Sequence, residues 1–179
     1  MSTVQLIKIQ SADLSHLWQI GFSQEAPAWT RFNAPYFNDY SAFESAEAFA
    51  GSSVAEFLLA DWVRGIKVDG QLIGMVSYYW ENEATQWLNI GIIIYDENYW
   101  SQGIGTRAMQ QWLDIIFDLY PELEHIGLVT WSGNPGMMHA ATKLGMQQEA
   151  RIRKVRYYQG VFYDSLMYGI LRDEWEKLK

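Results

Sequence analysis

Residues 87–109 constrain the fold more than any other part of the chain. Residues 88–95 form an almost unbroken apolar, β-branched run, which is the pattern of a strand covered on both faces. Gly103 and Gly105 follow, and they stand at the start of an amphipathic run. Its apolar residues recur at helical spacing: Ile104, Ala108, Trp112, Ile115, Ile116 and Leu119. The segment predicts a central strand, a glycine-bearing loop and a helix.

The glycine-bearing loop is a candidate anion site. The first N–H groups of a helix have no partner within the helix and carry the positive end of its dipole. Glycines let an anion approach those groups without a Cβ in the way. Alternatively, the two glycines only make a tight turn between strand and helix, and the loop alone favours neither interpretation.

The composition predicts one folded domain over residues 1–179. Hydrophobic residues make up 49% of the chain and charged residues 19%, which argues against disorder. No apolar run approaches the roughly 20 residues that span a bilayer. Residues 1–10 lack the basic start and apolar core of a signal peptide. We therefore expect a cytoplasmic protein without a membrane partner.

The chain contains no cysteine, which excludes disulfides, thiolate metal sites and a cysteine nucleophile. Three histidines, His16, His125 and His139, lie in separate segments without the spacing of metal ligands. We interpret each as an ordinary surface or core residue and predict no metal site.

The net charge of −8 is unevenly distributed. Residues 1–142 hold five basic and 16 acidic side chains, whereas residues 143–179 hold eight basic and five acidic ones. An acidic body makes nucleic acid an unlikely main partner and favours a cationic amine or a basic peptide, although acidity also serves solubility alone. The basic cluster of Arg151, Arg153, Lys154 and Arg156 is either an RNA or ribosome contact or, as we favour, a solvated strand face.

The remaining chain predicts an α+β fold with a mixed, mostly antiparallel sheet. Turn signals at Asp69-Gly70 and Gln159-Gly160 predict two hairpins. Asp13 is expected to cap a first helix, and residues 24–39 form an aromatic loop that either walls a pocket or extends the core. The expected strands are residues 4–9, 63–68, 71–80, 87–95, 126–131, 147–158 and 161–171. The expected helices are two pieces within residues 41–62, one that Pro121 ends, and residues 135–144.

Residues 103–108 also match the dinucleotide fingerprint G-x-G-x-x-A. That fingerprint requires its glycine turn directly after the first strand, with an acidic residue at the end of the second. Here seven residues separate the strand from Gly103, and Glu122 and Glu124 precede the second strand. We therefore disfavour a nicotinamide site.

Two segments together carry a family resemblance. Residues 100–106 read WSQGIGT, and Asn134 and the sequence KLGM at 143–146 follow some thirty residues later. This combination resembles the GNAT superfamily of acyl-CoA-dependent N-acyltransferases. Residues 160–175 resemble the RimJ/RimL-type branch, which includes acetyltransferases of protein N-termini. The resemblance covers nearly the whole chain and implies a splayed central sheet with helices on both faces.

The resemblance implies acetyl-CoA as co-substrate. It places the pantetheine along the central strand at Ile92, Ile93 and Ile94, bonded much as an added strand. It places the diphosphate at the helix start, so that the cofactor-binding candidates are Trp100, Ser101, Gln102, Gly103, Ile104, Gly105, Thr106, Arg107, Asn134 and Lys143. Asn134 is equally explained by helix capping, and Arg107 either meets a phosphate, as we favour, or is solvated.

The proton handlers that the family usually carries are absent. A Tyr, a Ser and a Glu that relatives use fall on Ala141, Met137 and Asn89. Without cysteine, we expect the amine to attack acetyl-CoA directly, aided by proximity, backbone oxyanion contacts and water. The remaining catalytic candidates are Glu83, Asn89 and Glu81, with Asp164 further along the chain. For each carboxylate, however, we favour the simpler interpretation of a solvated surface group.

The sequence therefore predicts an N-acetyltransferase acting on a primary amine. The first choice of acceptor is a protein N-terminus, from the branch resemblance. The second is a polyamine or another small cationic amine, from the acidic charge. The alternative is a catalytically silent acyl-CoA-binding or interaction module, and a homodimer stays open.

Overall fold

The computed structural model describes residues 2–179. They form two compact units, which are described separately. The first unit holds the chain up to Ser77 together with Ile92–Ala108, and the second holds Tyr78–Gly91 together with Met109–Lys179. Among the described residues, no helix is both long and apolar enough to cross a membrane.

The chain has the predicted α+β class, with a seven-stranded sheet. The strands are β1 (Val4–Ile7), β2 (Val63–Val68), β3 (Gln71–Asn82), β4 (Trp87–Ile94), β5 (His125–Trp131), β6 (Gln147–Tyr158) and β7 (Val161–Leu171). Their hydrogen-bonded order is β1-β2-β3-β4-β5-β7-β6. The pairs β1/β2, β2/β3, β5/β7 and β6/β7 are antiparallel, whereas β4 pairs with β5 in parallel at Leu88↔Ile126 and Asn89↔Gly127. The mixed, mostly antiparallel sheet is thereby confirmed.

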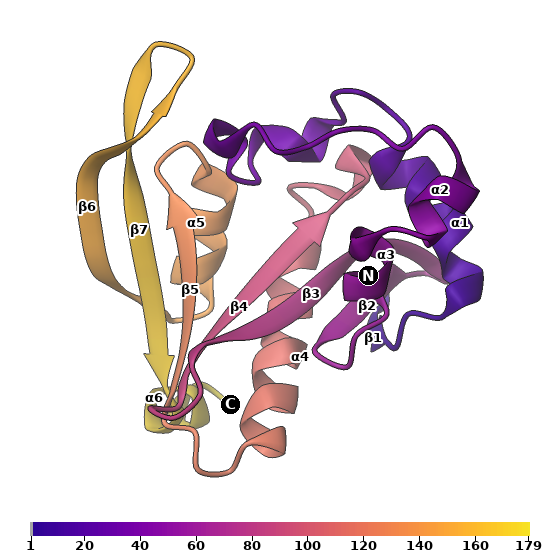
Figure 1. Ribbon diagram of the computed structural model, residues 1–179. Helices are drawn as coiled ribbons and strands as arrows, with labels where there is room; N and C mark the ends of the chain where they lie inside the picture. The colour runs from indigo at the N-terminus through magenta and orange to yellow at the C-terminus, as the bar shows by residue number, and fades with distance from the viewer. Residues whose placement is uncertain (1) are drawn as a thin grey trace. The chain divides into compact units, whose positions relative to one another are not determined.

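The first unit packs short helices beside β1 and β2 (Figure 1). These helices are α1 (Leu14–Leu17), α2 (Ala46–Ala50) and α3 (Ser53–Leu58). Ser45 and Ser52 cap α2 and α3, because each hydroxyl accepts an N–H bond three residues on. The β2–β3 hairpin turns at Asp69 and Gly70, which both have positive φ, as predicted.

Asp13 stands at the expected N-cap position of α1, but its side chain accepts no N–H of that helix. Its carboxylate instead accepts the N–H of Gln10 at 2.8 Å, because the helical segment already begins with a 3₁₀ turn at Ser11–Asp13. The aromatic loop contains two further 3₁₀ turns, Ala28–Arg31 and Pro35–Phe37. Trp29 is buried and packs against Phe22 and Tyr95, so this part of the loop extends the core. Phe37 in the second turn is exposed.

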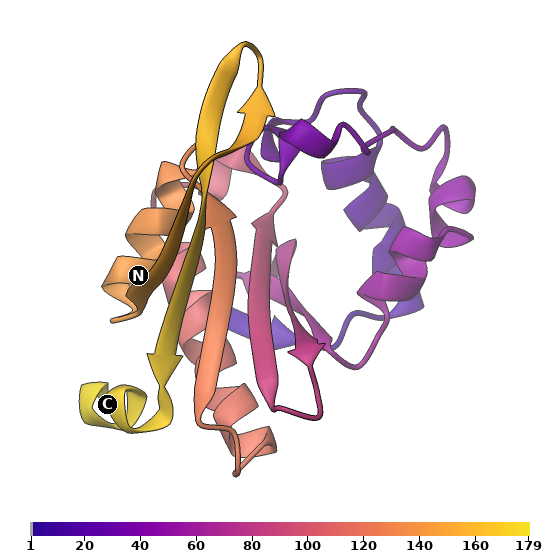
Figure 2. The same cartoon turned by 60° about the vertical axis from the view of Figure 1, so that its left-hand side comes forward.

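The second unit is built around the long β6–β7 hairpin beside β5 (Figure 2). It contains most of α4 (Ile104–Leu119), together with α5 (Pro135–Lys143) and α6 (Arg172–Leu178). Gly145, at φ +81°, follows α5 as the expected C-terminal cap glycine. Within this unit Tyr78 of β3 packs against Trp112 of α4.

Arg172 joins the end of β7 to the end of α4. Its guanidinium donates to the carbonyls of Leu123 at 2.9 Å, Tyr120 at 2.7 Å and Phe117 at 3.2 Å. It also lies 4.7 Å from the centre of the Phe117 ring. A cation at the C-terminal end of a helix satisfies carbonyls that have no intrahelical donor and complements the dipole.

Candidate functional site

The glycine-bearing loop enters α4 as the sequence predicts. The N–H of Arg107 donates to the carbonyl of Gly103 at 3.1 Å, which is the first turn of the helix. The amides between these residues therefore precede the helical hydrogen-bond ladder. Gly103 has φ +72°, and a Cβ built there would meet nothing within 4 Å, so the backbone conformation is what favours glycine.

Gly105 has a different role, since its backbone is compatible with any residue. A Cβ built on Gly105 would lie 3.7 Å from the Cδ1 atoms of Ile92 and Ile94, an ordinary contact distance. The protein itself therefore tolerates a side chain here. A glycine at this place leaves open space between the helix start and the side chains of Ile92 and Ile94. The free amides of the helix start fit the diphosphate of coenzyme A.

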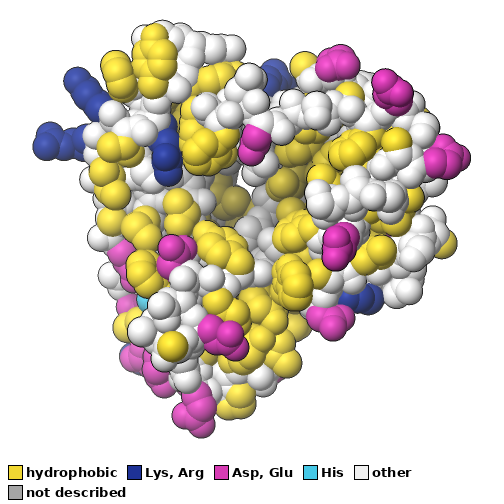
Figure 3. Space-filling view, in the orientation of Figure 1, with side chains coloured by type: hydrophobic (Ala, Val, Ile, Leu, Met, Phe, Trp, Pro, Cys, Tyr) yellow, Lys and Arg dark blue, Asp and Glu magenta, His cyan; other side chains and the backbone are white. Residues whose placement is uncertain are grey.

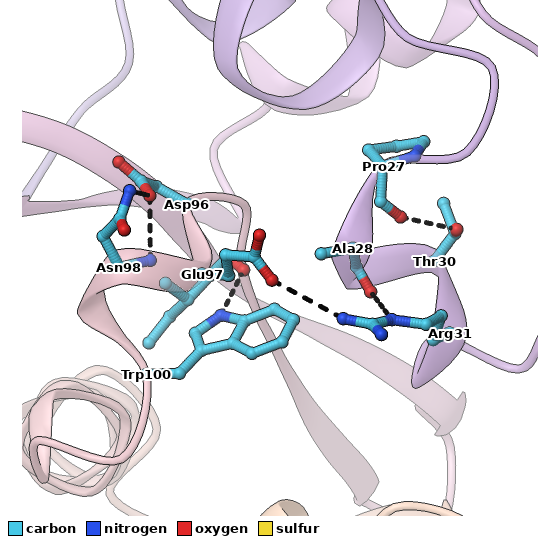
Figure 4. Close-up of polar contacts among 9 residues, drawn as sticks. Pro27, Ala28, Thr30, Arg31, Asp96, Glu97, Asn98 and Trp100 are labelled. Atoms are coloured by element: carbon cyan, nitrogen blue, oxygen red, sulfur yellow. Dashed lines mark hydrogen bonds and ion pairs between the residues drawn. The ribbon is translucent and has the colours of Figure 1, made fainter.

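The segment between β4 and α4 is held in place by side-chain contacts within the first unit (Figure 4). The indole N–H of Trp100 donates to the carbonyl of Ile94 at 3.0 Å. Asp96 accepts the N–H of Asn98 at 3.0 Å, and Glu97 pairs with Arg31 of the aromatic loop at 3.5 Å. These contacts fix the path by which the chain leaves β4.

The backbone of β4 has two different edges at its end. The N–H of Tyr95 donates to the carbonyl of Ile73 in β3 at 2.9 Å. Because backbone groups alternate along a strand, Ile93 faces β3 as well, while Ile92 and Ile94 present theirs to the other side. The amides of a pantetheine would find partners on that side, where the indole of Trp100 already uses the carbonyl of Ile94.

The other expected cofactor residues have identifiable contacts. Arg107 donates to the carbonyl of Ser2 at 2.7 Å, so part of its guanidinium binds the N-terminal segment. In the second unit Asn134 accepts the N–H of Met137 at 3.0 Å and thereby caps α5. Lys143 is exposed in the last turn of α5. Ser101 and Gln102 are exposed in the loop, Ile104 is buried, and Thr106 is partly buried.

Two of the expected catalytic residues lie together in the second unit. Asn89 is 1% exposed, and its Nδ2 lies 3.4 Å from Oε2 of Glu81. Burial raises the pKa of Tyr79, and a hydrogen bond from Asn89 acts in the opposite direction. Glu83 lies in the exposed turn that follows β3. Ala141, the position at which the resemblance would place a proton donor, is fully buried in the core.

Asp164 is unsuited to accept a proton. Its carboxylate accepts the Lys154 N–H at 2.9 Å and the Arg151 Nε–H at 2.6 Å. The two bonds, the Lys154 bond foremost, lower its pKa below the usual range of a carboxyl group. This hairpin is also where Lys and Arg side chains gather on the surface (Figure 3).

A pocket of about 390 Å³ lies on the sheet of the second unit. Asn89, His125, Glu149, Trp87 and Tyr168 are among its lining residues. Nε2 of His125 lies 3.0 Å from both carboxylate oxygens of Glu149. The interpretation of His125 as an ordinary residue overlooked this pair, because its two members are 24 positions apart in sequence and form no motif.

Comparison with known proteins identifies the family. The profile described as "Acetyltransferase (GNAT) domain" matches residues 3–147. A Bacillus subtilis protein named "Putative ribosomal N-acetyltransferase YdaF" is 27% identical over 131 residues, covering 68% of this chain and 70% of that protein.

Solved structures share the fold. The Vibrio cholerae spermidine N-acetyltransferase in complex with CoA and spermine has a TM-score of 0.73 at 18% identity, covering 97% of this chain and 98% of that one. A GNAT-family acetyltransferase from Bacillus anthracis has a TM-score of 0.72 at 16% identity, with coverages of 97% and 98%. The family match spans most of the chain and includes the strand, glycine loop and helix described above. The chain therefore belongs to the GNAT acetyltransferases and is an acetyl-CoA-dependent N-acetyltransferase.

Proposed function

We propose that this N-acetyltransferase acts on the α-amino group of a protein N-terminus and belongs to the RimJ/RimL-type branch. The observation that carries this proposal is the 27% identity to a Bacillus subtilis relative whose name points to a ribosomal substrate. The pocket of the second unit adds chemical support. Glu149 lines this pocket, Glu81 lies beside its Asn89, and both carboxylates are hydrogen-bond acceptors suited to an ammonium group.

The cofactor site in this proposal lies in the first unit. The amides of residues 102–107 hold the diphosphate of acetyl-CoA, and the outward-facing groups of Ile92 and Ile94 bind its amides. Arg107 adds positive charge to the same helix end. Bound acetyl-CoA supplies an acetyl thioester. Since the chain has no cysteine, the amine receives the acetyl group directly rather than through an enzyme thiol.

A polyamine is the second candidate acceptor. The net charge of −8 favours a cationic amine, and a structural neighbour is named as a spermidine N-acetyltransferase. The two carboxylates beside the pocket suit a substrate with more than one ammonium group as well as they suit a peptide.

A thiol-release assay separates these possibilities. The chain itself contributes no thiol, so every signal reports free coenzyme A. The panel consists of short peptides, the same peptides blocked at the α-amino group, spermidine and an aminoglycoside.

We expect the highest kcat/KM for the free peptides and none for the blocked ones. Higher kcat/KM for spermidine would replace the first candidate by the second. Tight binding of acetyl-CoA without thiol release from any amine would contradict both and support a silent binding module.

A further inference from the structure

Two glycines face each other across the β5–β7 pair. Gly127 and Gly169 are direct register partners. A Cβ on Gly169 would collide with Nε2 of His125 and, at 2.5 Å, with the carboxylate of Glu149. A Cβ on Gly127 would collide with Oδ1 of Asn89 and lie 3.2 Å from Cε1 of His125. The bare backbone at this one place is therefore what lets three polar side chains lie flat on the sheet.

The contact between His125 and Glu149 determines where the imidazole can accept a proton. A carboxylate only accepts hydrogen bonds, so Nε2 of the ring carries the hydrogen that is shared with Glu149. The neutral ring then has its lone pair on Nδ1. A carboxylate on the opposite nitrogen orients the ring and stabilises its protonated form.

The surroundings of His125 suit a proton acceptor that exchanges with water. The side chains of His125 and Glu149 are 27% and 44% exposed, so a captured proton can leave to solvent. The other titratable groups on this face are Tyr168 from β7, and Glu81 and Tyr79, which contact Asn89 from β3. Trp87 adds an aromatic wall beside the same pocket.

We propose that the pocket over Gly127 and Gly169 receives the acceptor amine, and that His125 takes its proton while Glu149 positions the imidazole. This inference rests on the proposed acetylation of a primary amine. A primary amine with a pKa near 8 or above is largely protonated at neutral pH and has no lone pair to attack with. The pocket is lined by a base, an amide and the Glu149 carboxylate, and Glu81 lies beside that amide, so an ammonium group can be held there.

The proton transfer completes a balanced reaction. The ammonium N–H bond breaks, its proton passes to Nδ1 of His125, and the electron pair stays on nitrogen. That pair forms the new C–N bond at the thioester carbonyl, and the C–S bond breaks with its electrons on sulfur. The second proton of the amine goes to the thiolate, and His125 returns its own proton to water.

The test compares His125→Gln, Glu149→Gln and the control His139→Gln, which changes an exposed histidine of α5. Two peptide acceptors are used, one with an ordinary α-amino group and one fluorinated at its first residue so that its amine is neutral at pH 7. Spermidine is assayed in parallel. Circular dichroism and acetyl-CoA binding check that each variant is folded.

For His125→Gln we expect kcat/KM with the ordinary peptide to fall about 10²-fold, the usual contribution of a general base. With the fluorinated peptide the loss should be less than about threefold, since that amine needs no base. For Glu149→Gln we expect a smaller loss of kcat/KM, again confined to the ordinary peptide, because the imidazole remains but is no longer oriented by the carboxylate. The His139→Gln control should match the parent.

Two results separate the failure of this inference from the failure of the proposed function. An active parent whose folded His125→Gln and Glu149→Gln variants keep its kcat/KM with the ordinary peptide would overturn the inference alone. Equal losses with both peptides would also overturn it, because a purely structural ion pair does not distinguish protonated from neutral amines. A parent that releases thiol with neither peptides nor spermidine would remove the proposed function and this inference with it.

Discussion

At the scale of single residues, the two glycines of the cofactor loop differ in what they do. Gly103 is required by its positive φ, whereas Gly105 has an ordinary backbone and neighbours at contact distance only. A single sequence motif therefore combines one conformational requirement with one requirement for open space. Substitution at Gly105 is the sharper probe, because it leaves the fold intact.

We predict that Gly105→Ala folds and that Gly105→Asp folds but binds acetyl-CoA at least about tenfold more weakly. The added carboxylate would lie in the first turn of α4, on the side of Ile92 and Ile94. A negative charge this close to a bound diphosphate is unfavourable by more than the ~1.4 kcal/mol that a tenfold change represents. Titration calorimetry with acetyl-CoA measures the dissociation constant. The control is Gln110→Asp, which adds the same charge at an exposed position of α4. Equal affinity of Gly105→Asp and the parent would contradict the placement of the diphosphate.

Asp164 gives a second prediction at this scale, on the pH dependence of stability. Its folded-state pKa is lowered, so the carboxylate stabilises the protein above its unfolded-state pKa near 4, and this contribution is lost as pH falls through the folded-state value. We expect Asp164→Asn to melt below the parent at pH 7, and the two melting temperatures to converge below about pH 4.

Thermal unfolding between pH 3 and pH 8 measures this difference. Glu44→Gln, at an exposed position of the first unit, serves as the control and should melt like the parent throughout. The difference in melting temperature between Asp164→Asn and the parent could instead stay constant over the whole pH range. That result would show that the ionisation of the carboxylate does not contribute to stability.

At the scale of elements, the connection between β7, α4 and α6 is the least expected from sequence. Arg172 donates to three carbonyls in the last turn of α4 and just after it, and Trp175 of α6 donates to Asp114 of α4 at 2.9 Å. The start of the final helix is thus hydrogen-bonded to α4 within the second unit.

We predict that Arg172→Gln lowers the free energy of unfolding by about 2–3 kcal/mol, since hydrogen bonds from a charged donor are lost at partly buried carbonyls. Urea titration measures the change. Lys177→Gln removes only a surface pair with Asp173 on α6 and should cost about 0.5 kcal/mol or less. A loss for Arg172→Gln no larger than that of the control would contradict a stabilising role of the Arg172 hydrogen bonds.

The sequence predicts an element well where a local signal, such as a turn, marks its ends. The last two strands match their expected bounds because a local turn at Gln159-Gly160 fixes them. The helix α6 was missed because a short, charged segment follows β7 without a break. A capping motif with Glu174, whose carboxylate accepts the N–H of Leu171, was the available signal.

The candidate site likewise has one part that local sequence predicts and one part that it does not. The cofactor loop is contiguous in sequence, so its glycines predict a strand, a turn and a helix start that the structure contains. The pairing of His125 with Glu149 depends on the register of three strands, and no spacing within the sequence encodes it. The local hints of a polar surface there are Asn89 inside an apolar strand and the glycines of two neighbouring strands.

At the scale of the whole molecule, the negative net charge affects how the protein meets its acceptor. The net charge is −8, and residues 1–142 contribute −11. Exposed charges steer a ligand of opposite sign over distances up to the Debye length, about 10 Å at 0.1 M salt. The protein should therefore capture cationic acceptors faster at low ionic strength.

We predict that raising salt from about 0.05 to about 0.5 M lowers kcat/KM several-fold for a lysine-rich peptide. A peptide with the same first two residues and acidic residues beyond them should show no such loss. Initial rates of thiol release under both conditions provide the measurement. Similar salt responses of the two peptides would show that the acidic surface serves solubility alone.

The opposed pair of Gly127 and Gly169 also allows a prediction about other proteins of the same fold. A chain of the same architecture that bears a larger residue at either place must displace the imidazole or do without it. The two glycines therefore form part of a sequence signature. It consists of a histidine two residues before a glycine on β5, a second glycine paired with the first on β7, and a glutamate on β6. Members that share this signature should share a dependence on acceptor basicity, and members that lack it should not.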